Sequence, residues 1–274
     1  IMKMATLQNL SAYTLLEIPT RILDLLKTAK NKGYEAVGLT DINVTYGLVN
    51  FYELAQKVGI KPLLGMQIRI NGLIDSAEKY DLIVIAKSDQ GYRNLLRLSS
   101  AINLLTDNGD NDRILALSEL KKYLEELVII TPANLRSELV MLFQRQEKLG
   151  SDYVRAIKKI IPQSSSLYLG VYDNESARNY INYVKSLSTQ FELPLVAVED
   201  DQYLEPQQQF LRKTLTTIKN GEKLQDVVAL AKQKGSHYML SSAEMKEKYQ
   251  NFGLEEAIEN TWKITQECDA KVVF

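Results

Sequence analysis

Polar side chains that could do chemistry follow several of the predicted strands of this chain. In parallel α/β folds the carboxyl ends of the strands meet at one edge of the sheet and carry the active site. Asp41, Asp200 and Asp201 come directly after two such strands, where carboxylates serve acid–base catalysis or bind hard cations such as Mg²⁺. The expected strand ends are residues 8–11, 40–42, 65–67, 131–132 and 199–202.

Histidine and cysteine are scarce, which limits the available chemistry. The chain has one histidine, His237, and one cysteine, Cys268. A hydrolytic zinc site takes several His, Cys or carboxylate ligands around an open position, and a Ser-His-Asp triad depends on its histidine. The turn-like stretch KGSHYMLSS around His237 favours a structural or surface histidine over a catalytic one. The usual zinc sites are therefore excluded.

Composition and charge indicate a folded protein without a general attraction to nucleic acid. Of the 274 residues, 45% are hydrophobic and 24% are charged. The net charge of −1 gives no bulk positive field toward DNA or an anionic membrane. We find no signal-like stretch and no apolar run of roughly 18 residues that would span a bilayer. We therefore expect a cytoplasmic protein that does not contact membranes.

The two ends of the sequence favour a fragment of a longer protein. Ile1 precedes the first methionine, and the last residues, CDAKVVF, form a strand-like apolar run with no stop signal after it. A chain of this length suffices for one large barrel or for a domain of about 200 residues with an appendage. We expect an N-terminal piece of a larger polypeptide.

Strand-like and helix-like segments alternate over most of the chain, which predicts an α/β fold with a largely parallel sheet. Residues 20–33 and 46–59 each have apolar residues at helical spacing and end at a glycine. About seven strands are expected by residue 200, and three helical patterns follow. We therefore expect a barrel-like domain to about residue 205, a helical extension after it, and a mobile surface loop at 106–113.

A set of motifs in a fixed order resembles a known family. The motifs are YTLLE at 13–17, TDI at 40–42, GLVNFY at 47–52, GIKP at 59–62 and GMQ at 65–67. With GYRNLLRLSS, LPLVAVEDDQYL, TLTTIKNGEKL and YMLSSAEMKEKY further on, they resemble the N-terminal PHP (polymerase and histidinol phosphatase) domain of bacterial DNA polymerase III α subunits, of the Gram-positive type. The resemblance implies a distorted (β/α)7 barrel over residues 4–205 and a helical extension over 206–274 that leads toward the polymerase palm.

The resemblance also implies that the metal site of the family is degenerate here. Active PHP domains hold two or three metal ions with His, carboxylate and sometimes Cys ligands, and they hydrolyse phosphoesters. Five ligand positions of this chain carry amide or apolar side chains, which bind divalent metals weakly or not at all, and the two apolar ones predict a cleft filled with side chains. The remaining carboxylates, Glu17, Asp41 and Asp200, are weak metal candidates, and hydrogen bonding within the protein is their favoured role. The vestigial cleft consists of Gln8, Leu10, Glu17, Asp41, Ile42, Gln67, Asp200 and Gln202.

By this resemblance, the intact protein is expected to be a DNA-directed DNA polymerase, a Mg²⁺-dependent nucleotidyltransferase of DNA replication whose polymerising carboxylates lie beyond residue 274. Our main hypothesis is a domain without catalytic residues or cofactor that acts as a scaffold. Its expected partners are the rest of the α subunit and other replisome proteins, with weak or no DNA contact of its own. The alternative is a residual metal-dependent phosphoesterase or 3′–5′ proofreading exonuclease that uses Glu17, Asp41 and Asp200. A binding module for a small phosphorylated ligand is a third option, but it lacks a glycine-rich phosphate loop.

Overall fold

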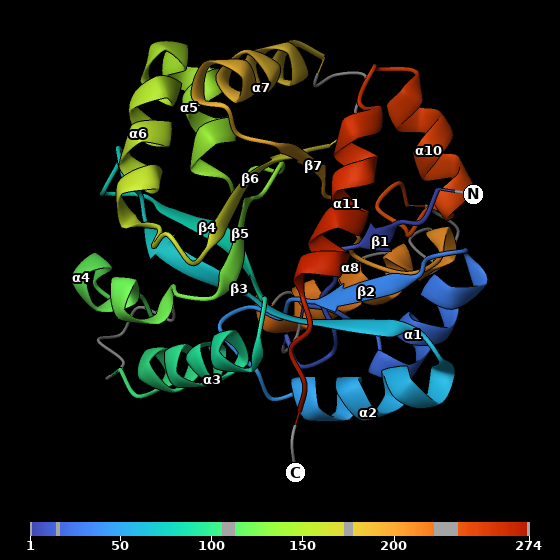
Figure 1. Ribbon diagram of the computed structural model, residues 1–274. Coiled ribbons are helices and arrows are strands. Elements are labelled where there is room, and N and C mark those ends of the chain that lie inside the picture. The colour runs from blue at the N-terminus through green and yellow to red at the C-terminus, as the bar shows by residue number, and fades with distance from the viewer. Residues whose placement is uncertain (1, 15–16, 106–112, 173–177, 222–234, 273–274) are drawn as a thin grey trace.

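The computed structural model describes residues 2–14, 17–105, 113–172, 178–221 and 235–272. Its centre is a single curled sheet of seven strands, which follow one another across the sheet in chain order (Figure 1). The predicted α/β architecture of seven strands is therefore confirmed. The strands are β1 (Ala5–Thr6), β2 (Ala36–Leu39), β3 (Lys61–Asn71), β4 (Lys79–Ala86), β5 (Leu127–Thr131), β6 (Ser166–Val171) and β7 (Leu195–Ala197).

The sheet is mostly parallel, with β4 as the exception. β1, β2 and β3 pair in parallel, as do β5, β6 and β7, whereas β4 is antiparallel to both of its neighbours. Residues 72–78 are too short a link between β3 and β4 for the crossover that a parallel pair requires. An isolated parallel bridge between Asn9 and Asp201 joins the segments that follow β1 and β7. The curled sheet is thereby drawn together at its carboxyl end, which we call the barrel mouth.

The helices form where apolar residues recur at helical spacing. Ile22, Leu25 and Leu26 bury one face of the first helix, and the two predicted stops, Gly33 and Gly59, have φ values of 87° and 75° that favour glycine. Within the described residues, short 3₁₀ turns lie at Lys121–Tyr123, Glu147–Leu149 and Pro206–Gln208. The α-helices of the described residues are α1 (Ile22–Asn31), α2 (Leu48–Val58), α3 (Asp89–Asn103), α4 (Leu117–Leu120), α5 (Glu138–Gln146), α6 (Gly150–Ile160), α7 (Arg178–Phe191), α8 (Gln209–Lys219), α10 (Ser242–Gln250) and α11 (Glu255–Glu267).

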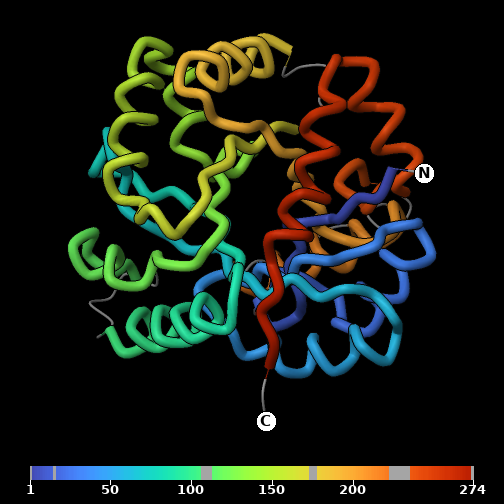
Figure 2. Tube along the Cα trace, viewed as in Figure 1, coloured from blue at the N-terminus to red at the C-terminus, as the bar shows by residue number. Residues whose placement is uncertain are grey.

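Helix α11 closes the end of the barrel opposite to the mouth, and it runs between β1 and β7 in Figures 1 and 2. Ile264 and Cys268 join the apolar cluster inside the curled sheet. The helix also bonds to strand starts, because the backbone N–H of Ala5 donates to Thr261 Oγ1 at 3.1 Å and the Asn260 amide donates to the carbonyl of Leu195 at 2.6 Å. The last part of the chain therefore packs directly on the sheet. The proposed division at residue 205 stays a prediction.

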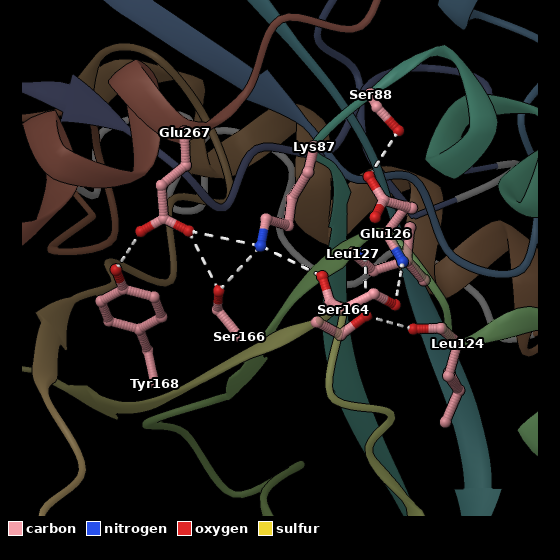
Figure 3. Close-up of polar contacts among 10 residues, drawn as sticks. Lys87, Ser88, Leu124, Glu126, Leu127, Ser164, Ser166, Tyr168 and Glu267 are labelled. Carbon is pink, nitrogen blue, oxygen red and sulfur yellow. Dashed lines mark hydrogen bonds and ion pairs between the residues drawn. The ribbon is translucent and has the colours of Figure 1, made fainter.

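A polar cluster fastens the end of α11 to the strands (Figure 3). Glu267 accepts hydrogen bonds from the Tyr168 hydroxyl at 2.5 Å and from Ser166 Oγ at 3.0 Å. Lys87 Nζ lies 3.9 Å from the Glu267 carboxylate and donates to the carbonyl of Ser164 at 3.1 Å. We call these five residues the α11 clamp. They hold the helix against β6 and against the end of β4.

Two further expectations concern loops and membranes. Residues 106–112 of the expected surface loop lie outside the described residues. Across the part of the chain that the structure describes, the search for a helix with the length and apolarity of a bilayer span finds none.

Candidate functional site

A buried series of side-chain hydrogen bonds occupies one side of the barrel mouth. The Gln8 amide, after β1, donates to Gln67 Oε1 on β3 at 3.2 Å. Gln67 in turn donates to Asp81 Oδ2 on β4 at 2.7 Å, and Arg69 Nε pairs with Asp81 Oδ1 at 3.0 Å. Gln8, Gln67 and Asp81 are each at most 5% exposed. We call these four residues the glutamine network, and its geometry holds the Gln67 amide between two protein partners.

Asp41 lies beside this network, and its hydrogen bonds anchor a turn. One carboxylate oxygen accepts from the Ser11 backbone N–H at 2.6 Å and from Thr14 Oγ1 at 2.8 Å, and the other accepts from Ser11 Oγ at 2.7 Å. Burial raises the pKa of Asp41, and these three hydrogen bonds act in the opposite direction. Asp41 therefore holds residues 11–14 against the end of β2.

Three other predicted cleft residues, Leu10, Glu17 and Ile42, are not part of the glutamine network. Glu17 forms an ion pair with Lys219 at the end of α8. Ile42 forms an isolated parallel bridge with Gln67 and is half-buried, as is Leu10. Of these three residues only Glu17 carries a carboxylate, and that carboxylate is paired with a cation.

The segment after β7 supplies the other side of the mouth. Gln202 donates from its amide to Asp200 Oδ2 at 3.2 Å. The next carboxylate, Asp201, has a pKa raised well above its usual value, first by burial and then by the negative charges of Glu199 and Asp200. Of these residues, Asp200 and Gln202 face the same cavity as Gln8.

That cavity has a volume of about 650 Å³ and lies on the β5–β7 side of the mouth. The expectation of a cleft filled with side chains stays a prediction, and the structure shows an open cavity beside the glutamine network. Leu10 and Ile42 do not line the cavity, so their side chains do not fill it. The structure brings Gln8, Asp200 and Gln202 together around this space and places Glu17, Asp41 and Gln67 outside its lining.

Sequence reasoning missed several residues of the mouth. Asp81 was hidden in the strand YDLIVIA, although a lone carboxylate in an apolar run is a signal, because a buried charge needs a partner. Arg136, Phe143 and Tyr180 line the cavity from the loop after β5 and from helices α5 and α7. No motif marks these three residues, since only the folded chain brings them together at the mouth.

A sequence model of the PHP domain matches residues 7–174, which includes β2 to β6 and the glutamine network. The chain belongs to the PHP domain family. The predicted resemblance is thereby confirmed.

The curated relatives of this PHP domain chain include DNA polymerase III α subunits. The subunit from Halalkalibacterium halodurans is 26% identical over 264 residues, which cover 96% of this chain and 23% of the subunit. The subunit from Borreliella burgdorferi is 28% identical over 279 residues, covering 96% of this chain and 24% of the subunit. An amidohydrolase from Chromobacterium violaceum aligns with 72% of this chain and 87% of its own, at 12% identity and a TM-score of 0.45, a similarity too low to indicate a shared activity. The chain spans about a quarter of the length of the polymerase subunits it matches.

The residues at the mouth do not fit the metal cluster that active PHP domains carry. Among the described residues, no three His, Cys, Asp or Glu side chains converge in a way that could hold a metal ion. Gln8 and Gln67 present neutral amides bonded to each other, and the carboxylates of Glu17 and Asp41 have cationic or hydrogen-bonding partners within the protein. Amides are weak ligands for divalent metals, so this arrangement is poorly suited to a metal cluster.

Proposed function

We propose that this chain is the PHP domain of a DNA polymerase III α subunit and that it serves as a scaffold without hydrolytic activity. Similarity to α subunits over 96% of the chain supports the first part. The partners would be the remainder of the subunit and other replisome proteins, for which the domain would offer a docking surface. In the whole protein, polymerisation would require Mg²⁺ at carboxylates outside these residues.

One observation carries the scaffold role. In the glutamine network, an amide from β1, an amide from β3 and a carboxylate from β4 bond to one another in a buried position. Each of these polar groups has a protein partner, so the network stabilises the mouth without an ion. A hydrolytic PHP site needs the opposite arrangement, with several anionic or imidazole ligands directed at one point.

A hydrolysis assay tests the proposal. The 274-residue chain is incubated with a 3′-mismatched primer duplex and with a nitrophenyl phosphodiester, in Mn²⁺, Zn²⁺ or Mg²⁺ and in EDTA. We expect the same background rate in every condition and the same rate for Asp200→Ala. Cleavage that requires a metal and disappears in Asp200→Ala would contradict the scaffold role.

The second candidate is a residual phosphoesterase or proofreading exonuclease. Its support is the position of Asp200 on a cavity large enough for a small molecule. Against it, Asp200 already accepts a hydrogen bond from Gln202, and the other two carboxylates proposed for it, Glu17 and Asp41, do not line the cavity. The Asp200→Ala comparison above separates the two candidates.

A further inference from the structure

The cavity at the mouth has the size and the lining of a small-molecule site. Its volume of about 650 Å³ falls within the roughly 300–1,000 Å³ of ligand pockets, which are mostly apolar with a few polar groups. Val140, Val198 and Tyr180 supply buried surface, each at most 7% exposed. Helices α5 and α7, which carry Val140 and Tyr180, lie together beside β6 and β7 in Figure 1.

The polar groups around this surface are mainly neutral. The ionisable lining residues besides tyrosine are Arg136, which is exposed, Asp200, which is bonded to Gln202, and His237, the single histidine of the chain. A strongly charged ligand would find no matching cluster of charge among these described residues. The carboxamide side chains of the lining are Gln8, Asn134, Gln144 and Gln202.

Two polar atoms of lining residues lack a partner among the described residues, the hydroxyl of Tyr180 and Nδ1 of His237. The Tyr180 side chain is 5% exposed, and its hydroxyl is buried with no hydrogen-bond partner among the described residues. Leaving such a group unsatisfied costs free energy, which a ligand group bonded to the hydroxyl would recover. The Tyr180 ring packs edge to face on the Phe143 ring, with 5.5 Å between their centroids. These two rings form an aromatic wall of the cavity, on the same side as the unpartnered hydroxyl.

We propose that this cavity binds a nucleobase without a metal ion. A nucleobase is planar, uncharged and edged with donors and acceptors, and carboxamides such as Gln144 and Gln202 pair with such edges. Aromatic side chains such as Phe143 stack on its face. The base would belong either to a free nucleotide or to the unpaired end of a DNA strand. The proposal goes beyond the scaffold role, because it assigns a ligand to the mouth that the scaffold does not need.

Calorimetric titration of the 274-residue chain in EDTA tests this inference. Adenosine, cytidine, thymidine and guanosine monophosphates are compared with a short single-stranded oligonucleotide, which separates the two sources of the base. The variants are Tyr180→Phe and Gln144→Ala. The first removes only the unpartnered hydroxyl, and the second truncates an exposed side chain. The control is Tyr168→Phe, whose hydroxyl belongs to the α11 clamp at the opposite end of the barrel.

We expect saturable binding in EDTA that weakens roughly 3- to 10-fold in each mouth variant, the effect of one net hydrogen bond, and is unchanged in Tyr168→Phe. The thermal midpoint of Tyr180→Phe should not fall, because the hydroxyl has no partner in the free protein. Absence of binding up to about 10 mM, or equal binding by both mouth variants and wild type, would overturn the inference and leave the scaffold role intact. Binding that requires a divalent metal would contradict both proposals.

Discussion

Replacing Gln67 by Glu places a carboxylate where the resemblance predicts a lost metal ligand, and it tests whether the glutamine network is a metal-free structural unit. The wild-type Gln67 amide donates to Asp81 Oδ2 at 2.7 Å. In Gln67→Glu this hydrogen bond to a charged group, worth about 1.5–3 kcal/mol, is replaced by two buried carboxylates at the same distance. A buried unpaired charge costs about 3–5 kcal/mol, and Arg69, 3.0 Å from Asp81, offsets part of it. We therefore expect a loss of about 2–4 kcal/mol in unfolding free energy near pH 8.

The loss should depend on pH in a defined direction. Burial and the Asp81 charge raise the folded-state pKa of the new glutamate above its unfolded value. A group with a raised folded pKa contributes stability that is complete below the unfolded pKa and is lost as the pH rises through the folded pKa. Gln67→Glu should therefore approach wild-type stability near about pH 5 and fall behind it toward about pH 8.

Urea and thermal unfolding across this pH range measure the effect. A loss of 2–4 kcal/mol corresponds to a thermal midpoint roughly 4 to 16 °C lower. Gln56→Glu, the same change at an exposed position of α2, is the matched control and should alter stability by less than about 0.5 kcal/mol. Wild-type stability of Gln67→Glu at pH 8, or a loss that does not vary with pH, would refute the reasoning.

Three further predictions concern the α11 clamp, Asp41 and Asp201. Tyr168→Phe removes the hydroxyl that donates to Glu267, whose side chain is 31% exposed. Urea unfolding should therefore show a loss of about 1–2 kcal/mol in unfolding free energy. An unchanged unfolding free energy would mean that the α11 clamp does not stabilise the fold. Asp41→Ala removes the acceptor of three buried hydrogen bonds and should lower the unfolding free energy by about 3 kcal/mol or more. A loss below about 1 kcal/mol in the same assay would disprove the anchoring role of Asp41. The pKa of Asp201 is raised by burial and by nearby carboxylates, so the stability from its protonated form is lost as the pH rises through that pKa. Asp201→Asn should lessen this decline, and an unchanged pH profile of the unfolding free energy would contradict the assignment.

The helices and the strand count could be predicted because their signals are local. Apolar spacing places α1 and α2, and Gly33 and Gly59 end them with positive φ values. The alternation of strand and helix patterns likewise predicts seven strands, which the structure confirms. The antiparallel direction of β4 could also be predicted, because the link between β3 and β4 at residues 72–78 is too short for a crossover connection.

The contacts of the candidate site could not be predicted because they join residues far apart in the chain. Glu17 pairs with Lys219, and Gln8 bonds to Gln67, yet no periodicity or motif links these positions. The same holds for the cavity, whose aromatic wall comes from α5 and α7. The resemblance predicts which positions have lost metal ligands, whereas the fold shows that Gln8, Gln67 and Gln202 hydrogen-bond within the protein.

Titration of Mn²⁺ into the 274-residue chain by calorimetry tests the central claim most directly. The claim is that the barrel mouth is stabilised by protein hydrogen bonds instead of a metal cluster. We predict no saturable heat in wild type and an identical trace for Asp200→Ala. A saturable site that disappears in Asp200→Ala would contradict the account.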